Sequence, residues 1–154
     1  MENLPKKTRV TRYNCILVKE TCHLYTVPRQ IKAPVDVYDY MEEVMQLSNQ
    51  SVEYFVAIFL DVKCKPIGYQ VISQGNLTAS LVHPREVFKG ALLANAYSIM
   101  VVHNHPSGDP RFSNEDRVIT KRVKEAGEIL GISLLDHIVI GDKAYLSFKE
   151  EEGL

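Results

Sequence analysis

Residues 99–116 read IMVVHNHPSGDPRFSNED, and they predict a buried strand, a loop and the start of a helix. The apolar run 99–102 is typical of a buried strand, in which alternate side chains point to the same face. His103 and His105 are therefore expected on one face, with Cα atoms about 7 Å apart at a rise of about 3.3 Å per residue. Two imidazoles at this separation can reach one metal ion.

A loop and a helix start follow the two histidines. Two prolines and a glycine between residues 106 and 110 break the strand, and Ser113 followed three residues later by Asp116 is typical of a helix N-terminus. Asp116 then falls in the first helical turn, where it can face the end of the strand. A merely capping Asp116 would not account for two histidines on one face. We therefore predict one zinc ion per chain, bound by His103, His105 and Asp116, with the open fourth position of a catalytic site.

The spacing H-x-H, seven residues, Ser, two residues, Asp resembles the JAMM (MPN) zinc metalloprotease motif. The version present here, HNHPSGDP followed by S-x-x-D, is similar to the RadC-like branch of that family. Similarity extends upstream to VHPREV at 82–87 and downstream to LDHIVIG at 135–141, and it covers the chain from about Tyr13 to the C-terminus.

The resemblance assigns two further residues. JAMM enzymes use a glutamate at the start of an earlier strand as general base, and the matching position is Glu53, just before the apolar run 54–60. A glutamate at such a place is otherwise usually a solvated strand end. Ser113 matches the serine that helps to hold the oxyanion in JAMM enzymes, and it is also the natural N-cap of its helix.

The motif and the resemblance together predict a zinc-dependent metallopeptidase or isopeptidase-type hydrolase, in which activated water attacks the amide carbonyl of a peptide or isopeptide-linked protein. The alternative is a non-catalytic zinc-binding interaction module linked to DNA repair or processing. Nuclease chemistry is less favoured because many nucleases use paired metals, and the signature of zinc deaminases is absent. Asn104 completes the string HNH, which we interpret as a coincidence.

The length of the chain favours a single domain, and its composition favours a cytoplasmic protein. The chain has 154 residues and a formal net charge of −1, which offers no electrostatic attraction to nucleic acid or to an anionic membrane. It has no apolar stretch long enough to cross a bilayer and no secretory signal, so we expect a cytoplasmic protein. The three cysteines form no C-x-x-C pair, which fits a reducing compartment.

The expected fold is α/β (α+β), a mixed sheet sandwiched by helices, and the resemblance implies the JAMM/MPN form of the cytidine deaminase-like architecture. A single domain over 10–148 is expected between a flexible leader, 1–9, and a frayed acidic tail, 149–154. Full-length RadC-like proteins carry a further N-terminal helical domain, and we expect only the leader in its place. Expected strands are 10–18 and 24–27, paired as a hairpin, then 54–60, 67–73, 99–103, 132–140 and 144–148. Expected helices are 36–47, 84 to about 95, and 113–130.

Two further histidines have structural roles in this prediction. His83 precedes a proline and is expected at a helix entry. His137 lies within an apolar strand, where an inward-facing histidine is usually satisfied by a hydrogen bond and is not a metal ligand.

Overall fold

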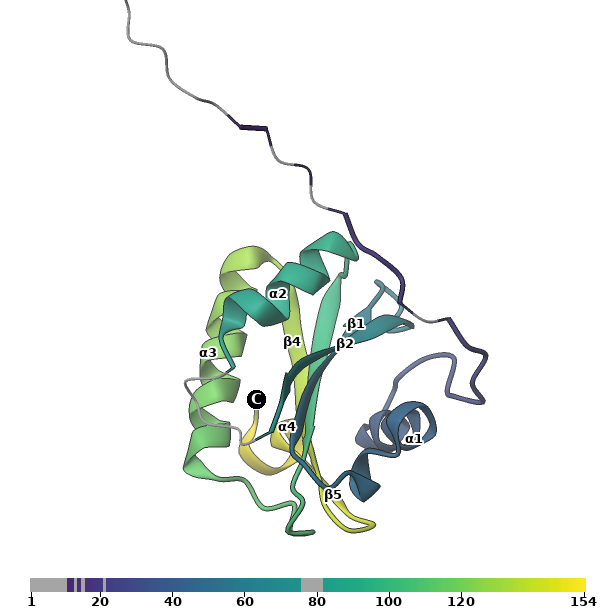
Figure 1. The fold of residues 1–154 in the computed structure, drawn as a ribbon. Helices are drawn as coiled ribbons and strands as arrows, with labels where there is room; N and C mark the ends of the chain where they lie inside the picture. Colours follow the sequence, from purple (N-terminus) through teal and green to yellow (C-terminus); the bar gives the residue numbers. More distant parts are fainter. Residues whose placement is uncertain (1–10, 13, 15, 21, 76–81) are drawn as a thin grey trace, which may run out of the picture.

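The computed structural model describes residues 11, 12, 14, 16–20, 22–75 and 82–154, and its centre is a five-stranded mixed sheet with helices on both faces (Figure 1). The strand order is β2–β1–β3–β4–β5, where only the β3–β4 pair is parallel. The strands are β1 (Tyr54–Leu60), β2 (Pro66–Gln74), β3 (Ser98–Asn104), β4 (Ser133–Ile140) and β5 (Tyr145–Ser147). This architecture confirms the predicted α+β class.

Helices cover the two faces unequally. α1 (Pro34–Met45), followed by the 3₁₀ turn η1 (Leu47–Asn49), lies on one face, and α2 (Pro84–Leu93) and α3 (Asn114–Leu130) lie on the other (Figure 1). The short helix α4 (Phe148–Glu152) directly follows β5. The candidate metal-binding residues come mainly from the end of β3 and the start of α3.

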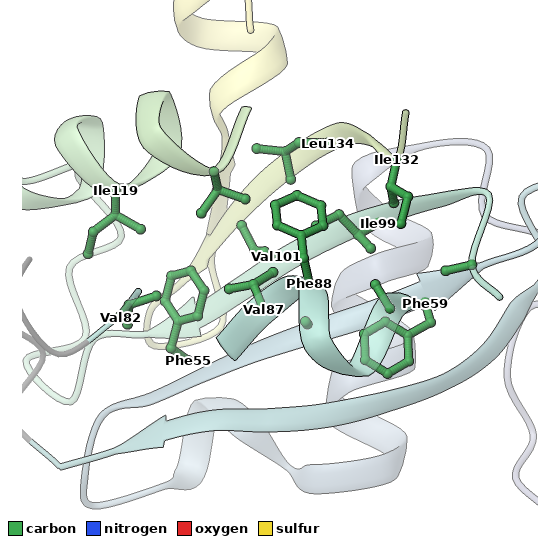
Figure 2. Packing of buried hydrophobic residues seen from close by; sticks show 14 residues of the cluster. Phe55, Phe59, Val82, Val87, Phe88, Ile99, Val101, Ile119, Ile132 and Leu134 are labelled. Atoms are coloured by element: carbon green, nitrogen blue, oxygen red, sulfur yellow. The ribbon is translucent and has the colours of Figure 1, made fainter. Parts of the chain in front are cut away.

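Two apolar clusters hold these layers together, one on each face of the sheet. Figure 2 shows the cluster under α2 and α3, in which Phe55, Phe88 and Ile99 pack together. Alternate residues of the central strands serve opposite clusters, so that Val56 of β1 faces α1 while Phe55 faces α2 and α3. Because β1 and β3 are covered on both faces, they read as continuous apolar runs in the sequence.

Local signals predicted most element boundaries. His83 caps α2 by accepting a hydrogen bond from the Arg85 amide, as expected of a helix entry residue. Ser113 and Asp116 form the predicted capping box of α3, which ends at Gly131 in a left-handed conformation with φ 70°. α1 begins two residues before its predicted start, because Pro34 can occupy the first helical position.

The predicted N-terminal hairpin is wrong for the described residues. No strand occurs among residues 11, 12, 14, 16–20 and 22–28, and the remaining positions of the 10–18 prediction lie outside the described residues. Strand-like alternation needs a buried face to become a strand. Ile16, Val18 and Leu24 remain 72%, 69% and 104% exposed, so this segment has no such face.

The C-terminal residues are more ordered than predicted. Phe148–Glu152 form α4, with Ser147 as N-cap accepting from the Glu150 amide. Arg117 of α3 makes an ion pair of 2.7 Å with Glu152. The helices and strands of the described residues therefore run from 34 to 152, beginning and ending later than the predicted domain of 10–148. In this same part of the chain, no helix is both long and apolar enough to span a membrane.

Candidate metal centre

The end of β3 brings two imidazoles together. His103 is fully buried and the His105 side chain is 17% exposed, and their Nε2 atoms lie 3.0 Å apart. His105 continues the parallel pairing to β4 beyond the formal strand end, since its amide donates to the carbonyl of Ile140 at 2.8 Å. The alternation of a strand therefore places both rings on the same side, as predicted.

The first turn of α3 adds a carboxylate to this pair. Asp116 Oδ1 lies 3.1 Å from His103 Nε2, and Asp116 Oδ2 lies 3.5 Å from His105 Nε2. The same Oδ2 accepts a hydrogen bond of 2.7 Å from the Ser113 amide. Capping and metal binding are therefore compatible roles, because a carboxylate has two oxygens with several lone pairs.

These spacings fit a single metal ion. Ligand atoms bound tetrahedrally at about 2.0–2.1 Å lie about 3.3 Å from one another, close to the 3.0, 3.1 and 3.5 Å found here. The His105 Nδ1 donates to the carbonyl of Asp109 at 2.7 Å, so a neutral His105 presents an Nε2 lone pair to the site. Lone pairs and a carboxylate gathered at one point could hold a metal ion.

The pKa values of Asp116 and His105 are shifted in the directions that favour a negative carboxylate beside a positive group. Burial alone would raise the pKa of the Asp116 carboxyl, but the neighbouring side chains of His103, His105 and Ser113 outweigh burial and hold this pKa well below its usual range. The hydrogen bond with Asp116 raises the pKa of His105 above its ordinary value, although burial opposes this shift. A metal ion satisfies the same lone pairs without a proton.

Glu53 reaches the same point from the residue before β1. Its Oε1 lies 4.0 Å from His103 Nε2, and one ligand atom from each of Glu53, His103 and His105 lies within 4.8 Å of the others. Asp116, at 3.1 Å, lies closer to His103 Nε2 than Glu53 does. Glu53, His105, Ser113 and Asp116 line a cleft of about 370 Å³.

Asn104 positions the segment that carries Glu53. Its buried side chain accepts from the Tyr54 amide at 2.8 Å and donates to the Val52 carbonyl at 3.0 Å, on the two sides of Glu53. Asn104 points to the opposite face of β3 from the histidines, because strand side chains alternate. The sequence interpretation did not foresee this contact, by which Asn104 orders the segment on both sides of Glu53.

The loop after His105 is packed against the end of β4. The Gly108 carbonyl accepts from the Asp142 amide at 2.9 Å, and a Cβ added to Gly141 would meet the Gly108 oxygen at 2.3 Å. Only a glycine at 141 allows this close approach. The loop in turn holds His105 through the carbonyl of Asp109.

We expect Gly141→Ala to weaken zinc binding by about tenfold or more, because the new methyl group displaces the loop that orients His105. Competition with a chromophoric zinc chelator measures this affinity. Gly68→Ala is the matched control, since a Cβ at Gly68 meets nothing within 4 Å. Equal zinc affinity in the two variants would show that the loop does not orient His105.

Two buried residues behind His103 complete the site. His137 Nε2 lies 2.8 Å from His103 Nδ1, and His137 Nδ1 lies 2.6 Å from the Thr120 hydroxyl. Burial holds the pKa of His137 well below its ordinary value, so the ring is neutral. His137 is therefore an inward-facing, hydrogen-bonded histidine, as predicted, and it contacts His103 directly. The sequence interpretation missed Thr120, whose signal was its i+4 spacing from Asp116 on the helix.

A mixed sheet whose buried strand ends in H-x-H beside a helix-borne aspartate is consistent with the JAB (MPN) class of domains. Residues 31–154 match the RadC-like JAB domain family, and the chain belongs to this family. The chain is similar to UPF0758 proteins of Thermotoga maritima (47% identity over 128 residues, 83% of this chain and 56% of the relative) and Methanosarcina mazei (49% over 123 residues, 80% and 53%). A UPF0758 protein of Geobacillus thermodenitrificans is 50% identical over 121 residues, 79% of this chain and 53% of the relative. The chain thus spans about half the length of the curated relatives that it matches.

Proposed function

We propose that this domain is a zinc-dependent hydrolase of the metallopeptidase or isopeptidase type. The observation that carries the proposal is the convergence of His103 Nε2, His105 Nε2 and Asp116 within 3.0 to 3.5 Å, with Glu53 beside them in an open cleft. A bound zinc ion would supply a Lewis acid that activates water and polarises an amide carbonyl. Membership of the RadC-like JAB family supports this chemistry.

The residues of the chain have separate roles in this proposal. His103, His105 and Asp116 hold the ion. Glu53, one step farther from the imidazoles at 4.0 Å, accepts the proton of the attacking water and returns it to the leaving amine. Ser113 uses its oxygen to accept from the Asp116 amide at 3.1 Å, so its hydroxyl proton stays able to donate to the developing oxyanion.

We expect purified protein to contain about one zinc ion per chain, and Asp116→Ala to lose most of it because the charged ligand is removed. Elemental analysis by plasma mass spectrometry measures the content. Asp39→Ala, which removes an exposed carboxylate on α1, is the matched control and should keep the ion. Full zinc content in Asp116→Ala would rule out Asp116 as a ligand.

The activity itself is tested by incubating zinc-loaded protein with an unbiased library of peptides and isopeptide-linked lysine conjugates, with cleavage detected by mass spectrometry. Zinc-dependent cleavage of an amide bond supports the proposal. A protein that binds zinc but cuts nothing, while capturing a protein or DNA partner, would instead support an interaction module.

A further inference from the structure

We infer that Thr120 and His137 form a hydrogen-bond relay that fixes the tautomer of His103 and directs its Nε2 lone pair toward the metal centre. This inference rests on the proposed metal site and extends it to two residues that bind no ion themselves. Both are positioning residues, since they act through His103.

The relay consists of three short contacts in the interior. The Thr120 hydroxyl oxygen lies 2.6 Å from the main-chain carbonyl of Asp116, and His137 Nδ1 lies 2.6 Å from the same hydroxyl. His137 Nε2 lies 2.8 Å from His103 Nδ1. Thr120 is 3% exposed and both histidines are fully buried, so solvent does not replace any of these partners. The path begins at Asp116 and returns, through His103, to the Asp116 carboxylate.

The main-chain carbonyl of Asp116 decides which group donates in each hydrogen bond of the relay. A carbonyl oxygen can only accept, so the single hydroxyl proton of Thr120 must be donated to Asp116, as the 2.6 Å separation of two oxygens requires. The Thr120 oxygen then offers only lone pairs, and His137 Nδ1 donates to it. A neutral imidazole carries one proton, so His137 Nε2 accepts from His103 Nδ1. His103 Nε2 is left with its lone pair.

If both hydrogen bonds of His137 were reversed, His103 could not bind a metal ion through Nε2. Thr120 would have to donate to His137, which would leave the two oxygens at 2.6 Å without a proton between them. His137 Nε2 would donate to His103 Nδ1, and the proton of His103 would then lie on Nε2, facing Asp116. A protonated Nε2 cannot coordinate zinc, so the tautomer of His103 decides whether the site is ready for the ion.

Aromatic packing keeps the relay in place. Phe148 stacks on His137 with ring centroids 4.9 Å apart and an interplanar angle of 8°, and Phe55 meets the same ring edge-on at 5.5 Å. These contacts oppose a flip of the imidazole, which would put Cδ2 and Cε1 in the places of Nδ1 and Nε2 and break both hydrogen bonds. His105, in contrast, is oriented by a main-chain carbonyl, and the two ligands are therefore fixed by independent means.

Thr120→Val tests the relay, because valine keeps the shape of threonine and has a methyl group in place of the hydroxyl group. We expect its zinc affinity to fall by about 10- to 100-fold in competition with a chromophoric chelator. Thr120→Ser keeps the hydroxyl and loses a methyl group, and we expect it to bind zinc nearly as tightly as the unchanged protein. Packing alone predicts the reverse order, with serine the weaker binder. Equal affinity of the valine variant and the unchanged protein, or a serine variant weaker than valine, would overturn the inference.

A second measurement does not depend on metal or activity. Long-range ¹H–¹⁵N correlation spectra of the metal-free protein, at a pH of about 9, well above the pKa of about 6.5 of an ordinary imidazole, report the tautomer of each neutral histidine. We expect His103 to be protonated on Nδ1 in the unchanged protein and in Thr120→Ser, and to gain the Nε2–H form in Thr120→Val. A His103 protonated on Nε2 in the unchanged protein would refute the relay. A protein with this tautomer that nevertheless binds no zinc would refute the proposed function alone.

Discussion

Glu53→Gln is expected to lower the rate of amide hydrolysis by about 10²- to 10⁴-fold while zinc content stays near one ion per chain. Glutamine keeps the size of the side chain, but its amide group cannot take a proton from water. We expect the proposed zinc ligands to be unaffected, because Glu53 Oε1 lies 4.0 Å from His103 Nε2, whereas Asp116 Oδ1 lies at 3.1 Å. The measurement is the rate of cleavage of a substrate found in the library, paired with elemental analysis.

The control for this experiment is Glu128→Gln, which makes the same chemical change at an exposed position on α3 far along the helix from the site. It should leave both hydrolysis and zinc content unchanged. Normal cleavage by Glu53→Gln would refute a general-base role for this residue. Loss of zinc together with loss of cleavage would instead assign Glu53 to the ligands.

Asp136→Ala is expected to lower the free energy of unfolding by about 3–5 kcal/mol. Asp136 is 1% exposed, and its two oxygens accept hydrogen bonds from the His137 amide at 2.7 Å, the Lys149 amide at 3.0 Å and the Ser147 hydroxyl at 2.5 Å. Alanine leaves these donors without their acceptor, and the hydrogen bonds of His137 and Ser147 lie in the buried interior. Urea denaturation followed by circular dichroism measures the loss.

Asp136→Asn separates hydrogen bonding from the size of the side chain. The amide oxygen can still accept from both main-chain amides, and Ser147 can accept from the amide nitrogen, so we expect a loss of only about 1–2 kcal/mol. Asp39→Ala, at an exposed position of α1, should change stability by less than about 0.5 kcal/mol. Equal losses for the alanine and asparagine variants at 136 would show that the donors do not account for the effect.

The zinc ligands proposed here were predicted from short stretches because the determinants are local. Strand alternation alone places His103 and His105 on one side, and the three-residue spacing from Ser113 to Asp116 is set by the capping box. The N-terminal hairpin failed for the opposite reason, since alternation between residues 11 and 28 meets no surface on which to pack. A local pattern therefore predicts a helix or strand correctly only where the rest of the fold buries its apolar face.

The residues that surround these ligands come from distant parts of the chain, so no local sequence pattern predicts them. Glu53 was proposed from resemblance, and the structure shows the means: antiparallel pairing of β1 with β3 sets Phe55 opposite His103, and Asn104 holds the preceding residues. A register shift in the parallel β3–β4 pair sets Met100 opposite Asp136 and Val101 opposite His137.

The sequence by itself therefore determined a strand, a loop and a helix start that gather two histidines and an aspartate, because hydrogen bonding and side-chain alternation within some fourteen residues decide that geometry. Only the tertiary structure decided which groups surround them. Strand register placed Glu53 in front of His103 and His137 behind it, and packing of α3 on the sheet brought Thr120 to His137. Register and helix packing arise from burying apolar surface across the whole domain, so a local pattern does not contain them.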